Sequence, residues 1–501
     1  MNKTEIINTK IGKVQGYVND GIQIFKGIQY AEPPIGELRF RPPVAKKSWD
    51  NVLNATKYGA CAYQGYSQLE EWFGKLQPES EDCLTLNIWT PATDNKKRPV
   101  MFWIHGGAFI MGAGVDPMYD GSALAKRGDV VVVTINYRLG AFGYLYIPGK
   151  TINVGQLDQI LALEWVRDNI ELFGGDPNNV TIFGESAGGY AVVSLCAMPA
   201  AKGLFHRVIA QSAPYIDPEL SNKATKKIMR KLGLKKNDIE GLGKIPPEKI
   251  IEAQNKYFEE DPTNILGLRP LVDGQTISIH PLKAFENGDC AHINFMIGTN
   301  LEESKLFTAL DPNLRKLNDA ESKKALVGYL GRLGLDNDKI ISILETYKEA
   351  RKGRDSTEAK EILAALITDV IFRNSTIRLL EAQSSHQRNT YNYIFTWKSP
   401  AFNGILGSCH ALELPFVFGT YNLPKIDEFA GKGRDVEILS QKIMDAWISF
   451  ARTGNPNHDG NPKWPSYDIE NRATMFIGKE WKVVNAAFDK ERAIWDGLLK
   501  I

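Results

Sequence analysis

The stretch TIFGESAGGYAV, residues 181–192, places Ser186 between Gly184 and Gly188 at the junction of two predicted elements. Its first residues are β-branched and aromatic, which is typical of a strand, whereas the residues after Ser186 can form a helix with an apolar face. Small residues at 184, 187 and 188 permit a tight turn, and a helix N-terminus beneath the serine favours negative charge. The pattern therefore predicts a strand, a sharp turn that exposes the serine hydroxyl, and a helix.

Short apolar runs closed by Gly, Pro or Asn precede and follow this turn, and they are typical of strands. A helical periodicity over residues 157–170 lies between two of them, which gives the order strand, helix, strand. The run VVVVTIN, residues 130–136, is apolar without alternation, as expected for a strand buried on both faces. The sequence thus predicts an α/β protein with a central, mostly parallel sheet covered by helices.

Two segments rich in Lys, Glu, Leu and Ala, at about residues 218–265 and 304–388, show helical periodicity. We expect them to form helical insertions over one face of the sheet. The chain shows no internal repeat and no Pro/Ser-rich linker that would separate independent units. Residues 1–501 are therefore predicted to form a single domain with a helical cap.

The composition argues against several classes of function. The chain has 60 basic and 59 acidic side chains without long runs of one sign, which disfavours nucleic acid or an anionic membrane as partner. No stretch has the apolarity of a membrane span or of a signal peptide, so a cytoplasmic location is expected. The five cysteines are scattered and form no Cys/His cluster, which predicts neither a metal site nor a cofactor. A small, weakly charged substrate is expected, and the oligomeric state is left open.

A serine hydroxyl becomes a nucleophile when a base removes its proton, and one of the seven histidines is expected to be that base. In this architecture the expected order is serine, acid, histidine, which leaves six histidines after Ser186. Five of them lie at strand starts, before a proline or in polar loops. His410 lies in a small-residue loop after the last strand signal, where it can project over the sheet. It is the preferred base.

The acid is expected just past the C-terminal end of a strand. The stretch FMIGTNLEESKLF, residues 295–307, supplies Glu302 and Glu303 at such a place. Asp273 beside Gly274 is more typical of a turn. Spacing alone does not separate Glu302 from Glu303.

An oxyanion hole requires backbone N–H groups that a carbonyl oxygen can approach closely. The stretch WIHGGAFIMG, residues 103–112, follows another predicted strand, and its Gly106-Gly107-Ala108 segment lacks large side chains. Together with the N–H of Ala187, which follows the serine, this loop predicts such a site.

With these motifs the chain resembles the type-B carboxylesterases of the α/β-hydrolase fold, the family of the cholinesterases and of microbial para-nitrobenzyl esterases. The resemblance starts at GKVQGYVNDGIQIFKGIQYAEPPIGELRF, residues 12–40, and continues through the segments around the serine. It includes CHALELPFVFG, residues 409–419, and ends at ISFARTGNPN, residues 448–457. It implies Glu303 as the acid, because the family's strand-end motif starts at Gly298. The implied catalytic residues are Ser186, Glu303 and His410, and the implied oxyanion donors are the N–H groups of Gly107, Ala108 and Ala187.

Three features depart from common family patterns. Ala108 stands where relatives often have glycine, and Ser304 follows the acid where many members also have glycine. Secreted relatives bridge cysteines placed like Cys61 and Cys83, whereas here we expect both to be thiols.

The resemblance implies a serine carboxylesterase that hydrolyses short- to medium-chain carboxylic esters through an acyl-enzyme on Ser186. Tyr66, Trp72 and Phe73 are expected to line the substrate pocket, and packing against the cap is the alternative reading of these aromatics. A quaternary ammonium substrate stacked on Trp72 is another alternative. An acyltransferase, or a lactone, carbamate or amide hydrolase, would use the same residues. A non-catalytic recognition protein is disfavoured because the serine, acid and histidine are all present.

Overall fold

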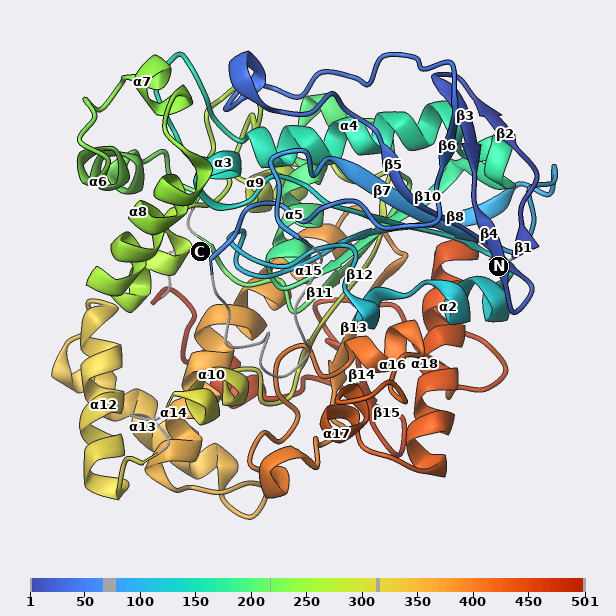
Figure 1. The fold of residues 1–501 in the computed structure, drawn as a ribbon. Helices are drawn as coiled ribbons and strands as arrows, with labels where there is room; N and C mark the ends of the chain where they lie inside the picture. Colours follow the sequence, from blue (N-terminus) through green and yellow to red (C-terminus); the bar gives the residue numbers. More distant parts are fainter. Residues whose placement is uncertain (1, 66–77, 217, 312–315, 499–501) are drawn as a thin grey trace.

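The computed structural model of the 501-residue chain describes residues 2–65, 78–216, 218–311 and 316–498 (Figure 1). Within these ranges the main feature is a sheet of 12 strands. In spatial order the strands are β1 (Asn2–Lys3), β4 (Tyr17–Asn19), β5 (Ile22–Gln29), β7 (Thr85–Thr90), β9 (Val131–Ile135), β8 (Arg98–Ile104), β10 (Gly175–Glu185), β11 (Arg207–Gln211), β12 (Asn294–Asn300), β13 (Thr390–Phe395), β14 (Thr474–Ile477) and β15 (Lys482–Val484).

In this spatial order each strand from β9 to β13 runs parallel to the next one, so that β9 to β14 form a parallel block. The strands at both edges of the sheet pair antiparallel. A separate sheet contains β2 (Ile7–Thr9), β3 (Gly12–Gln15) and β6 (Val52–Asn54). The mostly parallel central sheet confirms the predicted α/β class.

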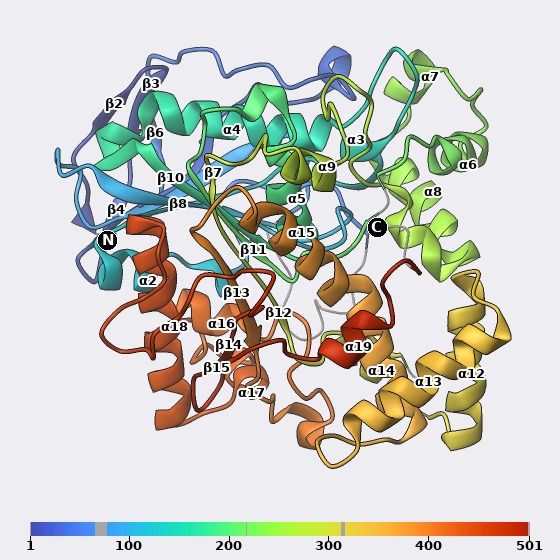
Figure 2. The ribbon, with the colours of Figure 1, turned by 180° about the vertical axis from the view of Figure 1, so that it is seen from behind.

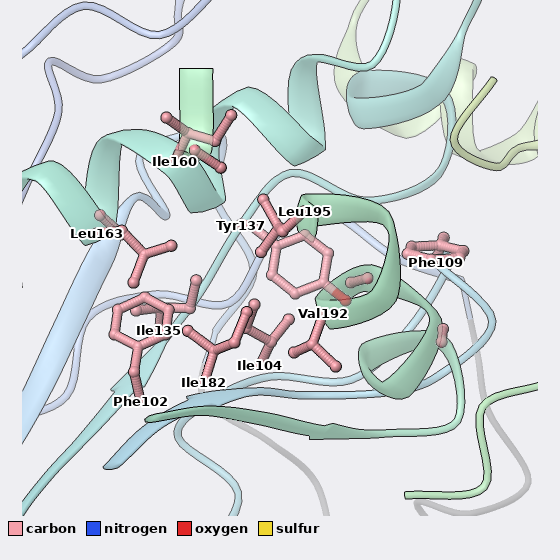
Figure 3. Close-up of a cluster of buried hydrophobic side chains, with 14 of the residues drawn as sticks. Phe102, Ile104, Phe109, Ile135, Tyr137, Ile160, Leu163, Ile182, Val192 and Leu195 are labelled. Atoms are coloured by element: carbon pink, nitrogen blue, oxygen red, sulfur yellow. The ribbon is translucent and has the colours of Figure 1, made fainter. Parts of the chain in front are cut away.

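Helices cover both faces of the central sheet, because its parallel strands are apolar on both faces. All residues of β8 and β9 are buried. In Figure 1, α4 (Val154–Asn169) and α5 (Ala187–Cys196) lie over one face, and α2 (Ser122–Gly128) and α18 (Arg434–Thr453) lie over the other. Figure 3 shows side chains of the sheet pointing towards α4 and α5, among them Phe102, Ile104, Ile135 and Ile182.

The register of the parallel strands places several strand ends at one edge of the sheet. Gly184 of β10 is opposite Ile104 of β8, and Glu185 is opposite Gln211 of β11. Gln211 is in turn opposite Gly298 of β12. The loops that follow these strands therefore meet at the carboxyl edge, where ligand sites of such sheets lie.

The two predicted insertions are helical, and most of their helices lie on the side of the molecule opposite the N-terminal strands (Figures 1 and 2). The first contains α6 (Lys223–Lys231), α7 (Ile239–Gly243) and α8 (Pro247–Glu260). The second contains α10 (Lys305–Leu310), α12 (Asp319–Arg332), α13 (Asn337–Arg351), α14 (Ala359–Thr368), the π-helical turn η6 (Asp369–Arg373) and α15 (Asn374–Ser384). The last of these, α15, contacts β12 and β13, so the second insertion is anchored directly on the sheet.

Every helix in the described part of the chain is too short or too polar to cross a bilayer. Cys83 is a buried thiol, and burial raises its pKa. The expectation of thiols at both Cys61 and Cys83 stays a prediction.

Candidate active site

Ser186 lies at the sharp turn between β10 and α5, which confirms the predicted strand, turn and helix. Its backbone has φ 57° and ψ −122°, a conformation that is strained for a residue other than glycine. The Ser186 N–H donates to the carbonyl oxygen of Gln211 at 2.9 Å, which holds the turn against β11. A Cβ atom at Gly184 or Gly188 would collide with the carbonyl oxygen of Ile104. The glycines therefore permit the close packing that keeps the serine in this conformation.

His410 and Glu303 contact each other although 107 residues separate them in the chain. The Nδ1 atom of His410 lies 2.7 Å from Oε2 of Glu303, and both side chains are buried. The other carboxylate oxygen of Glu303 accepts the N–H of Asn300 at 2.6 Å, and the His410 N–H donates to the Glu303 carbonyl at 3.2 Å. These bonds orient the imidazole through its Nδ1 atom, so that Nε2 lies on the side of the ring away from Glu303.

Glu185, the residue before the serine, provides the second contact of the histidine ring. Its Oε1 atom lies 3.0 Å from Nε2 of His410. The hydrogen bonds among described residues include none between His410 and the Ser186 hydroxyl, and such bonds often form only when substrate is bound. Glu185 lies inside the GESAGG motif, and this position is the sequence signal that could have singled it out.

The electrostatics of this group favour the protonated imidazole. Burial lowers the pKa of His410, but the nearby carboxylates of Glu185 and Glu303 outweigh burial and hold that pKa well above its ordinary value. Burial raises the pKa of Glu185, against the opposing effect of His410. The histidine therefore binds a proton more tightly than an isolated imidazole does.

A third glutamate, Glu413, is buried and follows His410 by three residues, and it was not singled out from the sequence. Its carboxyl group accepts hydrogen bonds from Gln211 at 3.0 Å and from Asn300 at 2.7 Å. Burial and the carboxylates of Glu185 and Glu303 raise its pKa to about 8. Glu413 therefore binds a proton more tightly than an ordinary carboxyl group does. An acidic residue in the otherwise apolar stretch LELPFVF is the signal that could have drawn attention to it.

The loop after β8 lies directly beside the serine. A Cβ atom at Gly106 would be 3.1 Å from Cβ of Ser186, so the loop approaches the nucleophile closely. Gly107 has φ 102° and Ala108 has φ 52°, and the Gly107 carbonyl accepts the N–H of Met111 at 3.0 Å. Residues 107–111 thus form a tight turn, which follows Gly106 directly in the chain. Ala187 is the first residue of α5, where the N–H has no helical acceptor.

The predicted pocket residues Tyr66, Trp72 and Phe73 lie outside the described residues. Two other aromatic rings flank the histidine: Phe307 of α10 and Phe372 of η6, with ring centroids 5.3 and 4.9 Å from that of His410. Both belong to the second insertion and were not singled out from the sequence. Phe307 is 48% exposed, so it presents an apolar face beside the histidine. The described part of the chain contains no cluster of His, Cys, Asp or Glu suited to a metal ion.

Comparison with known proteins gives consistent matches over the whole chain. A model of the carboxylesterase family matches residues 3–495. The para-nitrobenzyl esterase of Bacillus subtilis (strain 168) is 37% identical over 97% of this chain and 98% of its own length. The phenmedipham hydrolase of Pseudarthrobacter oxydans is 35% identical over 95% of both chains. Among solved structures, a Geobacillus stearothermophilus carboxylesterase at pH 6.2 has a TM-score of 0.86 and 38% identity, and covers 98% of this chain and 100% of its own.

Proposed function

This chain belongs to the carboxylesterase family, and we propose that Ser186, His410 and Glu303 carry out its hydrolysis of carboxylic esters. The chain has the α/β-hydrolase fold of its relatives and is a carboxylic-ester hydrolase. The observation that carries the residue assignment is the 2.7 Å contact between His410 Nδ1 and Glu303 Oε2, at the sheet edge that also holds the Ser186 turn.

In the proposed mechanism His410 takes the proton of Ser186 as the serine oxygen attacks the ester carbonyl. The alcohol leaves with a proton from His410, and an acyl group remains on Ser186. Water then gives up a proton to His410 and attacks the acyl-enzyme. His410 returns this proton to the Ser186 oxygen as the acid is released. Glu303 orients the ring, and its carboxylate together with that of Glu185 offsets the charge of the transient imidazolium.

We assign the developing oxyanion to the N–H groups of Gly107, Ala108 and Ala187. The close approach of Gly106 to Ser186 supports this assignment, because it brings the loop near the serine oxygen that attacks the ester carbonyl carbon. One such donor typically contributes about 3 kcal/mol to transition-state stabilisation. The left-handed backbone of Ala108 is compatible with donation from a position where relatives often have glycine.

Short- to medium-chain carboxylic esters are the proposed substrates. The aromatic rings of Phe307 and Phe372 beside His410 support an apolar acyl or alcohol group. With p-nitrophenyl esters of increasing chain length, kcat/KM should be highest between acetate and octanoate and should fall for palmitate. The Ser186→Ala variant supplies the background rate. Phenmedipham is assayed beside the p-nitrophenyl esters because one relative is named for its hydrolysis. Preference for palmitate would contradict the chain-length assignment.

The pH dependence of kcat/KM follows from the raised pKa of His410. A histidine base works only when neutral, so activity should rise with pH along a limb centred above pH 6.5. Glu185→Gln removes one of the carboxylates that stabilise the imidazolium, and should move this limb to lower pH. The matched control is Glu358→Gln, because Glu358 is exposed and pairs with Lys360. A limb at or below pH 6.5 in the wild type, or one unmoved by Glu185→Gln, would contradict this electrostatic picture.

A further inference from the structure

The glutamate beside the proposed acid contacts the histidine loop rather than the histidine itself. The Oε2 atom of Glu302 accepts the N–H of Ser408 at 2.9 Å, and the Glu302 N–H donates to the Ser408 carbonyl at 2.9 Å. Ser408 lies two residues before His410. Backbone and side chain of Glu302 therefore bind the same residue of the loop that carries the proposed base.

The loop is shaped to receive this carboxylate. Gly407 has φ 54°, and a Cβ atom there would collide with Oε2 of Glu302. The hydroxyl of Ser408 donates to the carbonyl of Phe395 at the end of β13, at 2.7 Å. The Asn300 side chain donates to the carbonyl of Cys409 at 2.6 Å. Residues 407–410 are thus held by the strand ends and by Glu302.

The other carboxylate oxygen of Glu302 is linked to α14 of the second insertion by an ion pair with Lys305. Its Oε1 atom lies 2.7 Å from Nζ of Lys305, which lies 3.0 Å from a carboxylate oxygen of Glu361 in α14. The three side chains are only 17 to 22% exposed. Burial lowers the pKa of Lys305, but the two carboxylates outweigh burial and raise it, so the lysine stays charged.

Ser304, which replaces the glycine found in many relatives, adds a second tie to α14. Its hydroxyl donates to the carbonyl of Ala364 at 2.7 Å, and its N–H donates to Oγ1 of Thr368 at 3.2 Å. The segment 302–305 thus contacts the histidine loop on one side and α14 on the other.

We propose that Glu302 is a positioning residue for His410, and that Lys305 couples this role to α14. The inference rests on the proposed function, in which His410 is the base. Partly exposed ion pairs contribute little to the free energy of unfolding. Loss of the Glu302 contacts is therefore expected to change mainly the geometry of the loop that carries His410. A displacement of about 1 Å at a catalytic group can cost about 100-fold in rate.

The test compares Glu302→Ala with Glu302→Gln, using Glu358→Gln of the same insertion as matched control. Glu302→Ala should lower kcat about 100-fold with little change in KM. Glu302→Gln retains an oxygen that accepts the Ser408 N–H and should recover most of this loss. The alanine variant should also shift the acid limb of kcat towards pH 6.5, because the ring is less well held against its carboxylates. A merely structural residue would leave the pH limb in place.

Lys305→Met tests the coupling to α14. It should lower kcat less than Glu302→Ala does, and the double variant should be no worse than Glu302→Ala alone, because both changes act through one contact. Fully additive losses would overturn the coupling. Circular dichroism shows whether Glu302→Ala folds. If it does not fold, Glu302→Gln and Lys305→Met still test the proposal, because the proposal requires Lys305→Met to have a lower kcat than the wild type.

Two outcomes distinguish failure of this inference from failure of the proposed function. If His410→Ala is inactive while folded Glu302→Ala keeps the wild-type kcat and pH limb, the positioning role is wrong and the function stands. If His410→Ala hydrolyses esters as the wild type does, the proposed function itself is wrong. Equal losses in Glu302→Ala and Glu302→Gln would also overturn the positioning role.

Discussion

Replacement of Ser186 by alanine is expected to lower kcat by about a millionfold, as found when the nucleophile of a serine hydrolase is removed. The variant lacks the oxygen that forms the acyl-enzyme, and no neighbouring hydroxyl occupies the same turn. The fold should be retained, because the Ser186 N–H bond to Gln211 and the packing of Gly184 and Gly188 do not involve the hydroxyl.

Steady-state hydrolysis of p-nitrophenyl butyrate with thermal unfolding in parallel measures both effects. Ser194→Ala is the matched control, because Ser194 is a buried serine of α5, the helix that follows Ser186, and its hydroxyl donates to the Tyr190 carbonyl at 2.9 Å. It should keep the wild-type kcat. A Ser186→Ala protein that retains a tenth or more of the wild-type kcat would refute the assignment of the nucleophile.

Replacement of Glu303 by glutamine should lower kcat by about 10⁴-fold while leaving the site geometry nearly unchanged. The amide can present an N–H to Nδ1 of His410, which places the imidazole proton on Nε2. In that tautomer Nε2 cannot accept the proton of Ser186. Loss of the negative charge also removes one of the groups that hold the pKa of His410 up.

Glu302→Gln is the control, since it makes the same chemical change one residue away. Measured side by side, Glu303→Gln should be far less active than Glu302→Gln, whose amide still accepts from Ser408. The reverse order would mean that Glu302 is the acid and that the 2.7 Å contact of Glu303 is structural.

Several features of the site could be predicted from the sequence because they depend on short-range chemistry. The turn at Ser186 follows from a strand, small residues and a helix in immediate succession. The glutamates Glu302 and Glu303 could not be separated in this way, because both lie in the turn after β12. The structure separates them by contact: Asn300 binds Glu303, which contacts His410, whereas Glu302 contacts Ser408.

Other features depend on contacts between distant parts of the chain, and the local sequence does not show what those contacts do. Glu413 acquires its raised pKa only from burial and from the carboxylates that surround it. Phe372 reaches His410 from a π-helical turn, and such turns do not follow the 3.6-residue periodicity by which helices are recognised. The roles of the oxyanion donors and of the catalytic residues stay predictions until they are tested by mutation.

The most direct test of the account is intact-mass analysis after treatment with a fluorophosphonate probe, followed by peptide mapping and assay of the same sample. We expect one adduct per chain, located on Ser186, with ester hydrolysis lost in proportion to labelling. The His410→Ala variant should react much more slowly with the probe, because its serine lacks a base. Absence of an adduct on Ser186 in a protein that hydrolyses esters, or full labelling of Ser186 without loss of hydrolysis, would contradict the central claim.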